Sequence, residues 1–210
     1  MHSSLPLIAL VGTATALPKI PFVTSKDIIP LPQAAASAVV AISRRQAACF
    51  VIGSTTLPEE VADVADSLAS TVTCSSDTTT IAGVPDVTSG SVTYSSIDFS
   101  QSSDSPLQFA LDNFATEDVV ADSDLTFFQD ALNVYLATEA GIRSVDGSLA
   151  IKVPKFFLEM QVSRIETAQG NPPTEAGLQV DHLRDKVLKN AAGEDSGLLD
   201  QVTTLATQLQ

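Results

Sequence analysis

SDLTFFQDALNVYLATEAG, at residues 123–141, predicts a long amphipathic helix and decides the fold class. Ser123 or Asp124 is expected to cap its N-terminus, and Gly141 marks the place near which it should end. The apolar residues of its buried face recur at helical spacing: Phe128, Ala131, Leu132, Tyr135 and Leu136. A chain built around such a segment belongs to a helix-rich class.

Helical patterns continue on both sides of this segment. A short helix is expected to open at Ser105-Pro106, and two amphipathic helices are predicted at about 175–191 and 196–208. Residues 154–168 are ambiguous, because their apolar residues also fit the period of a strand. Their Glu, Met, Gln and Arg content and a Lys–Glu pair four residues apart favour a helix. Just before them, residues 149–153 alternate as a brief strand.

The part before residue 105 predicts a small sheet. ACFVIG, at 48–53, is expected to form a short buried strand, and a helix with a capping box is predicted at about 57–72. Residues 67–105 hold 19 Ser or Thr in 39 positions. Apolar residues interleaved between 92 and 99 favour a bulged strand there over a mucin-like stalk. The predicted fold is a helix-rich single α+β domain, with a small Ser/Thr-rich β region near the mature N-terminus.

The N-terminus predicts secretion. Residues 1–16, MHSSLPLIALVGTATA, combine a short polar start, an apolar run and small residues, as a signal peptide does, with cleavage after Ala16. The apolar run is far shorter than the roughly 20 residues that span a bilayer, so no transmembrane segment is predicted. We therefore expect the protein to be extracellular.

A second processing signal follows. Residues 17–45 contain four Pro and end in the dibasic pair Arg44-Arg45. A kexin-like processing protease cleaves such a pair on an exposed linker, because its acidic subsites bind two consecutive cations. The segment is therefore interpreted as a pro-segment, and residues 46–210 as the mature domain. That domain carries seven basic and 24 acidic residues, a formal net charge of −17.

The charge is unevenly distributed. No Lys or Arg lies between Arg45 and Arg143, whereas residues 46–142 carry 15 Asp and Glu. An acidic surface excludes nucleic acids and anionic lipid surfaces as partners. It leaves cations, basic proteins and apolar ligands as the expected partner classes.

Cys49 and Cys74 are the two cysteines of the chain, and a disulfide between them is predicted for an oxidising compartment. The rival interpretation, a catalytic cysteine, requires a nearby base. His182 is the one histidine of the mature chain, and its charged sequence neighbours predict an exposed position. Neither a histidine-rich metal site nor a Ser-His-Asp triad is therefore expected.

Acidic residues could also bind a cation. The densest cluster is Glu117, Asp118, Asp122 and Asp124, which we regard as weak calcium candidates. Their spacing lacks the glycine turn and terminal Glu of an EF-hand, and Asp before a helix is more typical of a cap. No cofactor is predicted.

Aromatic residues of the last hundred positions offer an apolar pocket as a further hypothesis, although such residues are more typical of a core. They are Phe127, Phe128, Tyr135, Phe156 and Phe157.

Five stretches of the chain carry a resemblance to known proteins: ACFVIG, GVPDVTSG, YLATEAGIRSV, IKVPKFFLEMQVSRI and GLQVDHLRDKVLKN. Together they resemble a family of small secreted fungal proteins without an assigned activity. The resemblance covers about residues 47–190, and it implies a fungal, extracellular origin and a single domain. It supplies no catalytic or binding residues.

The predicted function is a non-enzymatic secreted binding protein whose ligand is a host molecule, a wall component or an apolar compound. The alternative is a secreted hydrolase that uses paired carboxylates at acidic pH. No motif singles out two of the many carboxylates, and the absence of Trp removes a common platform for sugar rings.

Overall fold

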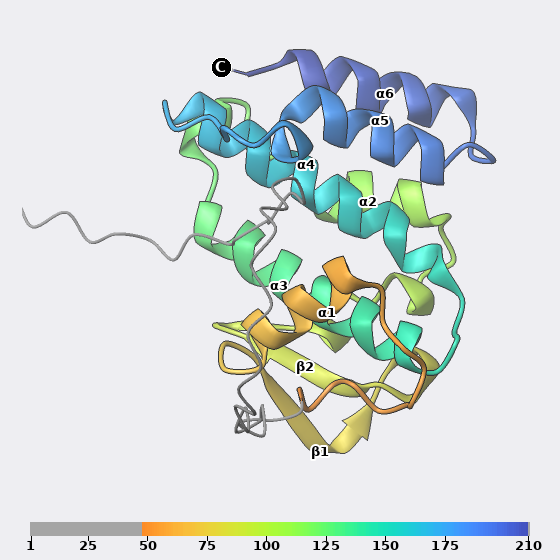
Figure 1. The fold of residues 1–210 in the computed structure, drawn as a ribbon. Coiled ribbons are helices and arrows are strands. Elements are labelled where there is room, and N and C mark those ends of the chain that lie inside the picture. Colours follow the sequence, from red (N-terminus) through yellow and green to blue (C-terminus); the bar gives the residue numbers. More distant parts are fainter. Residues whose placement is uncertain (1–47, 210) are drawn as a thin grey trace, which may run out of the picture. The chain divides into compact units, whose positions relative to one another are not determined.

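The computed structural model describes residues 48–209, with the helix α3 (Leu125–Ser144) at its centre (Figure 1). Asp124 caps this helix by accepting a hydrogen bond from the N–H of Phe127 at 3.1 Å, as expected. From Val134 to Ile142 nearly every residue is buried, whichever way it faces. The helix is therefore surrounded by other elements, more completely than an amphipathic pattern predicts.

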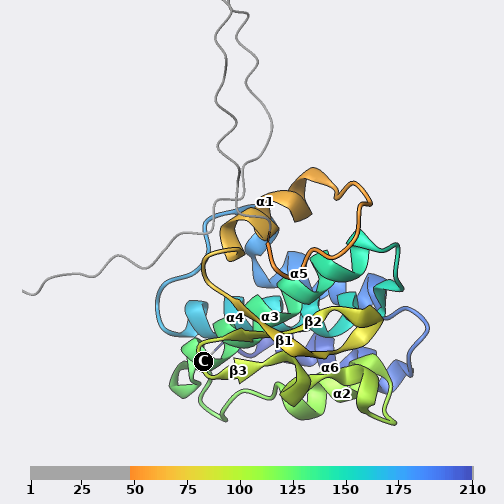
Figure 2. The ribbon, with the colours of Figure 1, turned by 90° about the horizontal axis from the view of Figure 1, so that it is seen from below.

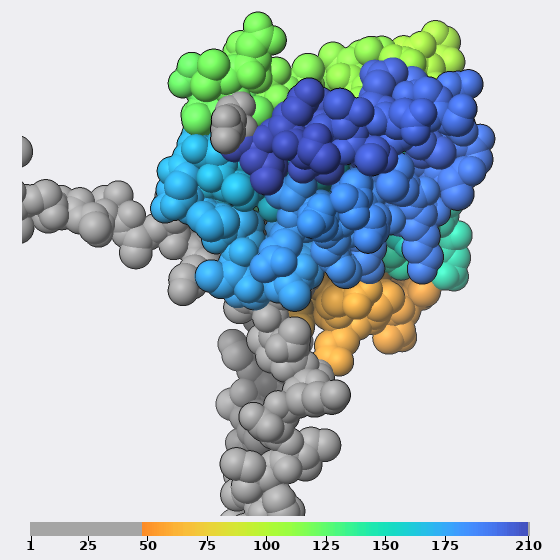
Figure 3. Space-filling view, turned by 90° about the horizontal axis from the view of Figure 1, so that it is seen from above, coloured from red at the N-terminus to blue at the C-terminus, as the bar shows by residue number. Residues whose placement is uncertain are grey.

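Residues 48–209 contain five further α-helices: α1 (Glu59–Leu68), α2 (Pro106–Asn113), α4 (Lys152–Ala168), α5 (Val180–Asn190) and α6 (Ser196–Thr207). α1 and α4 contact α3 directly, α5 and α2 pack against α4, and α6 packs against α5. The helices thus form successive layers, with α5 and α6 outermost (Figures 1 and 3). The ambiguous segment 154–168 is helical, as predicted.

A small antiparallel sheet covers another side of α3 (Figure 2). Its strands are β1 (Thr73–Thr79), β2 (Pro85–Ser89) and β3 (Val92–Thr93), hydrogen-bonded in the order β1-β2-β3. Gly90 makes the turn between β2 and β3 with φ 51°, in the left-handed region that favours glycine. The predicted α+β class, with its small Ser/Thr-rich sheet, is confirmed.

The aromatic core joins the sheet side to the helices at Tyr135 of α3. The Tyr135 ring lies 5.2 Å from that of Tyr94 and 5.8 Å from that of Phe114, centroid to centroid, both edge to face. Its hydroxyl donates to the carbonyl of Ile97 at 2.6 Å. All three rings are fully buried, so this contact fixes how the sheet and α2 sit on α3.

Two predicted strands are absent, and a third is much shorter than predicted. Residues 48–53 form turns and irregular backbone, and 149–153 are a 3-10 turn that runs straight into α4. After Thr93, β3 gives way to 3-10 turns at Tyr94–Ile97 and Phe99–Gln101.

Local hydrogen bonds explain these differences. Asp86 accepts from both the N–H and the hydroxyl of Ser95, and Asp98 accepts from the N–H of Ser100. Such side-chain acceptors satisfy backbone groups that a strand would pair with a neighbour. α4 begins at Lys152, two residues before Pro154. This is possible because the first turn of a helix does not need an N–H donor, so it tolerates proline.

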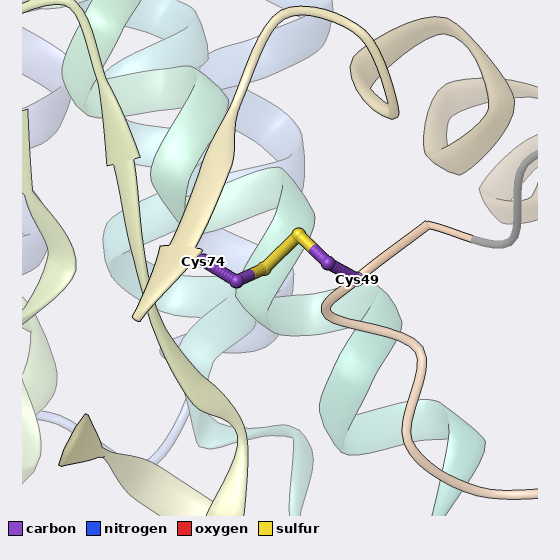
Figure 4. The surroundings of a disulfide bond; sticks show 2 residues. All are labelled: Cys49 and Cys74. Atoms are coloured by element: carbon purple, nitrogen blue, oxygen red, sulfur yellow. A yellow bond between two sulfur atoms is a disulfide. The ribbon is translucent and has the colours of Figure 1, made fainter. Parts of the chain in front are cut away.

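α1 is shorter than predicted and lacks the expected capping box. The helix begins after Pro58, where no side chain caps it, and ends at Leu68. Cys49 and Cys74 form the predicted disulfide, with Cα atoms 6.0 Å apart. It ties the N-terminal segment to β1, rather than a strand to the end of a helix (Figure 4).

The N-terminal segment is also held against the end of α3. The hydroxyl of Ser144 accepts hydrogen bonds from the N–H groups of Ile52 and Gly53, at 3.2 and 2.9 Å. The Ser144 carbonyl accepts from the N–H of Thr55 at 3.1 Å. These bonds replace the ladder of the strand that was expected at this place.

Candidate functional site

A group of charged side chains lies where α3, α4 and α5 meet, and we call it the cationic cluster. It contains four cations and two carboxylates. Its members are Glu139 and Arg143 of α3, Lys152, Lys155 and Glu159 of α4, and Lys186 of α5.

Lys155 occupies the centre of the cluster. Its Nζ lies 3.4 Å from Oε2 of Glu139 and 3.6 Å from Oε1 of Glu159. The same ammonium lies 3.6 Å from the centroid of the Phe156 ring. Lys155 is only 7% exposed, and a buried cation is tolerated when carboxylates and an aromatic face replace its water. Lys155 thereby links α3 to α4.

Arg143 binds the same carboxylate from the other side. Its Nε donates to Oε1 of Glu139 at 2.8 Å, and its Nη2 lies 2.7 Å from that oxygen. The two residues are four apart in the last turns of α3, a spacing that brings side chains together. A cation there also interacts favourably with the negative end of the helix dipole. Glu139 is 4% exposed, and a protein cation contacts each of its oxygens: Arg143 contacts Oε1 and Lys155 contacts Oε2.

Lys152 and Lys186 are the unpaired cations of the cluster. None of the ion pairs found among residues 48–209 includes either of them. Burial lowers the pKa of the Lys152 ammonium, and the positive charges of Arg143, Lys155 and Lys186 lower it further, whereas Glu139 opposes them. Both lysines are only half-buried and can meet a ligand.

Glu159 experiences the opposite effect. Burial raises the pKa of its carboxyl, and the neighbouring Glu139 raises it too, while Lys155 and Lys186 act against this. Its side chain is 11% exposed.

The cluster stands out against the acidity of the rest of the chain. It holds four of the seven basic residues of 46–210, and its four cations exceed its two carboxylates. A partly exposed site with surplus lysine ammonium groups can bind carboxylate, sulfate or phosphate groups by charge-assisted hydrogen bonds.

A further buried cation, Arg164 of α4, has a structural role. Its Nη2 donates to the carbonyl of Gln208 at 2.9 Å, and its Nη1 donates to Oε1 of Gln161 at 2.5 Å. Gln161 in turn donates to the carbonyl of Phe114 at 2.7 Å. Burial lowers the pKa of Arg164 to about 10. This network fastens the end of α6 and the end of α2 to α4.

The predicted calcium candidates are not gathered into a site. Asp124 caps α3, and the N–H of Glu117 donates to the hydroxyl of Ser123 at 3.0 Å. Asp122 lies in a 3-10 turn, and Asp118 is exposed in the loop before it. Within residues 48–209, no three His, Cys, Asp or Glu side chains form a group that could hold a metal ion.

The other candidates differ in their exposure. His182 is exposed on α5, and Phe128, Tyr135 and Phe157 are buried core residues. Phe127 and Phe156 are half-buried, and Phe156 packs under the ammonium groups of the cluster. Three of the five rings are therefore core residues, and the Phe127 ring contacts one of them, Phe128, edge to face.

The residues predicted to mark the processing sites, Ala16, Arg44 and Arg45, lie outside the described residues. Among those that are described, no helix has both the length and the apolar character to cross a membrane.

The cationic cluster was missed by the sequence reasoning. The Lys155–Glu159 spacing was noted only as a sign of a helix, and the Glu139–Arg143 pair has the same spacing. Nothing in one sequence indicates that the two pairs meet across α3 and α4, or that Lys186 joins them.

Comparison with known proteins supports a family assignment without an activity. No curated protein and no solved structure matches the chain. The model of one family, described as a domain of unknown function (DUF7143), matches residues 51–210, which include all the helices and strands described above. The chain therefore belongs to the DUF7143 family.

Proposed function

We propose that the protein is a secreted fungal binding protein without enzymatic activity, and that it recognises an acidic group of a wall component or host molecule through the cationic cluster. The signal-peptide pattern of residues 1–16 and the dibasic pair Arg44-Arg45 support secretion and processing. The resemblance of residues 47–190 to secreted fungal proteins supports the origin.

The observation that carries the proposal is the surplus charge at Lys152 and Lys186. Arg143 and Lys155 are engaged by Glu139 and Glu159, whereas these two half-buried lysines have no carboxylate at ion-pair distance among the described residues. Burial is the largest cause of the lowered pKa of Lys152, and repulsion by the positive charges of Arg143, Lys155 and Lys186 lowers it further. An anionic ligand would relieve that repulsion, which gives it a favourable binding free energy.

The alternative, a hydrolase with paired carboxylates, would use the two carboxylates of the same cluster. Glu139 and Glu159 are neighbours, and a raised pKa such as that of Glu159 suits a general acid. However, Lys155 lies between them within 3.6 Å of both, where the substrate oxygen and the water would have to sit. Both carboxylates are also largely buried. The geometry therefore favours binding.

The test is isothermal titration of the purified protein with sulfate, citrate and trigalacturonate at low ionic strength, with neutral maltotriose as the control ligand. The variants are Lys152→Gln and Lys186→Gln, singly and combined. Lys189→Gln is the matched control, since Lys189 is an exposed lysine of α5 outside the cluster. Each cluster lysine is expected to change the affinity about fivefold, the effect of about 1 kcal/mol, and added salt should weaken binding.

Two results would contradict the proposal. One is that no anion binds the wild type more tightly than the double variant. The other is turnover of a glycoside that Glu159→Gln abolishes, which would establish the hydrolase alternative.

A further inference from the structure

A small pocket lies away from the cationic cluster, between the C-terminal half of α4, the N-terminus of α5 and the end of α6. Its volume is about 200 Å³. Figure 3 shows the face on which α5, α6 and the loop before α5 come together. Carbon-rich walls come from Pro172, Pro173, Val180 and Leu209. The pocket is smaller than typical drug-sized sites, so it fits a short ligand.

Ser163 of α4 lines this pocket and has an unused hydroxyl. The residue is 2% exposed, and its Oγ has no hydrogen-bond partner in the structure. Burying a hydroxyl without a partner costs free energy, so a ligand that accepts its hydrogen bond would be stabilised there.

The N-terminus of α5 adds further donors at the same place. Gln179 and Val180, at the start of the helix, both line the pocket. The first N–H groups of a helix have no acceptor within it, and no side chain caps α5; the first hydrogen bond of the helix is from the N–H of Leu183 to the carbonyl of Gln179. These groups also carry the positive end of the helix dipole, which favours an anion.

Asp181 and Arg164 are charged residues near the pocket, and both interact with groups other than these donors. Asp181 also lines the pocket, but its carboxylate is 83% exposed and binds Nη1 of Arg184 at 2.8 Å. Arg164 holds the carbonyl of Gln208, which fixes the position of the adjacent Leu209 as an apolar wall. The pocket therefore combines hydrogen-bond donors at one place with apolar walls at another.

We propose that this pocket binds a short-chain aliphatic carboxylic acid in its ionised form. The carboxylate accepts hydrogen bonds from the Ser163 hydroxyl and from the first N–H groups of α5. The alkyl chain packs against Pro172, Pro173 and Leu209. This site is independent of the cationic cluster and of the function proposed for it.

The experiment is titration of the purified protein with hexanoate at pH 7, followed by NMR or calorimetry, with methyl hexanoate as the uncharged analogue. Ser163→Ala removes one donor, and its unliganded stability should equal or exceed that of the wild type, because the lost hydroxyl had no partner. Val180→Pro removes the first N–H of α5, at the helix position that tolerates proline, after an extended Gln179 with φ −74° and ψ 147°.

Each variant is expected to weaken hexanoate binding at least fivefold, and methyl hexanoate should bind at least tenfold more weakly than hexanoate. Thr204→Ala, at an exposed hydroxyl of α6 outside the pocket, is the matched control and should bind as the wild type does. The proposal is overturned if hexanoate does not bind saturably, if Ser163→Ala binds it unchanged, or if the ester binds as tightly as the acid. Loss of hexanoate binding in the Lys152→Gln, Lys186→Gln double variant would place the ligand at the cationic cluster instead.

Discussion

Replacing Gly53 with Ala is expected to destabilise the domain by about 3 kcal/mol, through loss of the contact between the N-terminal segment and α3. A Cβ at this position would lie 1.9 Å from the carbonyl oxygen of Ser144 and 2.5 Å from its carbonyl carbon. Both are backbone atoms, so the segment itself must move away. A shift of about 1 Å breaks hydrogen bonds of ordinary length.

The magnitude follows from the bonds that this movement breaks. Ile52, Gly53 and Thr55 each donate a backbone N–H to Ser144, at 3.2, 2.9 and 3.1 Å. At about 1 kcal/mol for each bond, their loss amounts to about 3 kcal/mol. For a domain of this size the midpoint of thermal unfolding should fall by about 6–12 °C.

Urea unfolding monitored by circular dichroism measures the effect, with the free energy extrapolated to water. Gly177→Ala is the matched control, because a Cβ on Gly177 would meet no atom within 4 Å, and it should leave the stability unchanged. If the free energy of unfolding of Gly53→Ala is within about 0.5 kcal/mol of that of the wild type, the segment accommodates the Cβ without losing these hydrogen bonds, which contradicts the prediction.

Three further predictions concern stability and pH. Replacing Cys49 and Cys74 with Ser should cost about 3 kcal/mol by chain entropy, and iodoacetamide should label the native protein only after reduction; labelling without reductant would contradict the disulfide. Arg164→Met should leave the Gln208 carbonyl unpaired and speed hydrogen exchange at the end of α6, while exchange in α1 stays as in the wild type. Burial raises the pKa of Glu159, so the folded state holds its proton to higher pH than the unfolded chain does, and stability falls as pH rises through that range. Glu159→Gln should therefore be more stable than the wild type at pH 7 and equal to it below about pH 4 in urea unfolding; a variant less stable at pH 7 would refute the sign.

Helices could be predicted from the sequence because their signals are local. Ser105 and Asp124 were expected to start helices, and both accept a hydrogen bond from an N–H three residues ahead. Patterns of apolar residues placed α2, α3, α5 and α6, and residue composition with a Lys–Glu pair placed α4, although several boundaries differ by a few residues.

Short strands could not be predicted in the same way. The pattern of apolar residues in a segment does not show which part of the chain will accept the hydrogen bonds of its backbone. Residues 48–53 form the continuous apolar run of a buried strand, yet Ser144, more than 90 positions away, accepts the N–H groups of Ile52 and Gly53. Asp86 likewise accepts a hydrogen bond from the N–H of Ser95, within the segment where a bulged strand was predicted.

The candidate site shows the same limit. Of its three ion pairs among the described residues, two join residues four apart on one helix, a spacing that is visible in the sequence. The two pairs contact each other at Lys155 because α4 packs on α3. Lys186 of α5 lies near them, over the Phe156 ring. Such packing is a property of the tertiary structure.

The position of the lysines has a practical consequence for binding assays. Every lysine of the predicted mature chain lies on α4 or α5, at 152, 155, 186 or 189, and the first three belong to the cationic cluster. Apart from the N-terminal amine, amine-reactive dyes, cross-linkers and sensor surfaces will therefore attach at the exposed Lys189 and at the half-buried Lys152 and Lys186 of the candidate site. A protein coupled in this way would lose positive charge at the two cluster lysines on which the proposed binding depends. Immobilisation through an affinity tag would keep the cluster free.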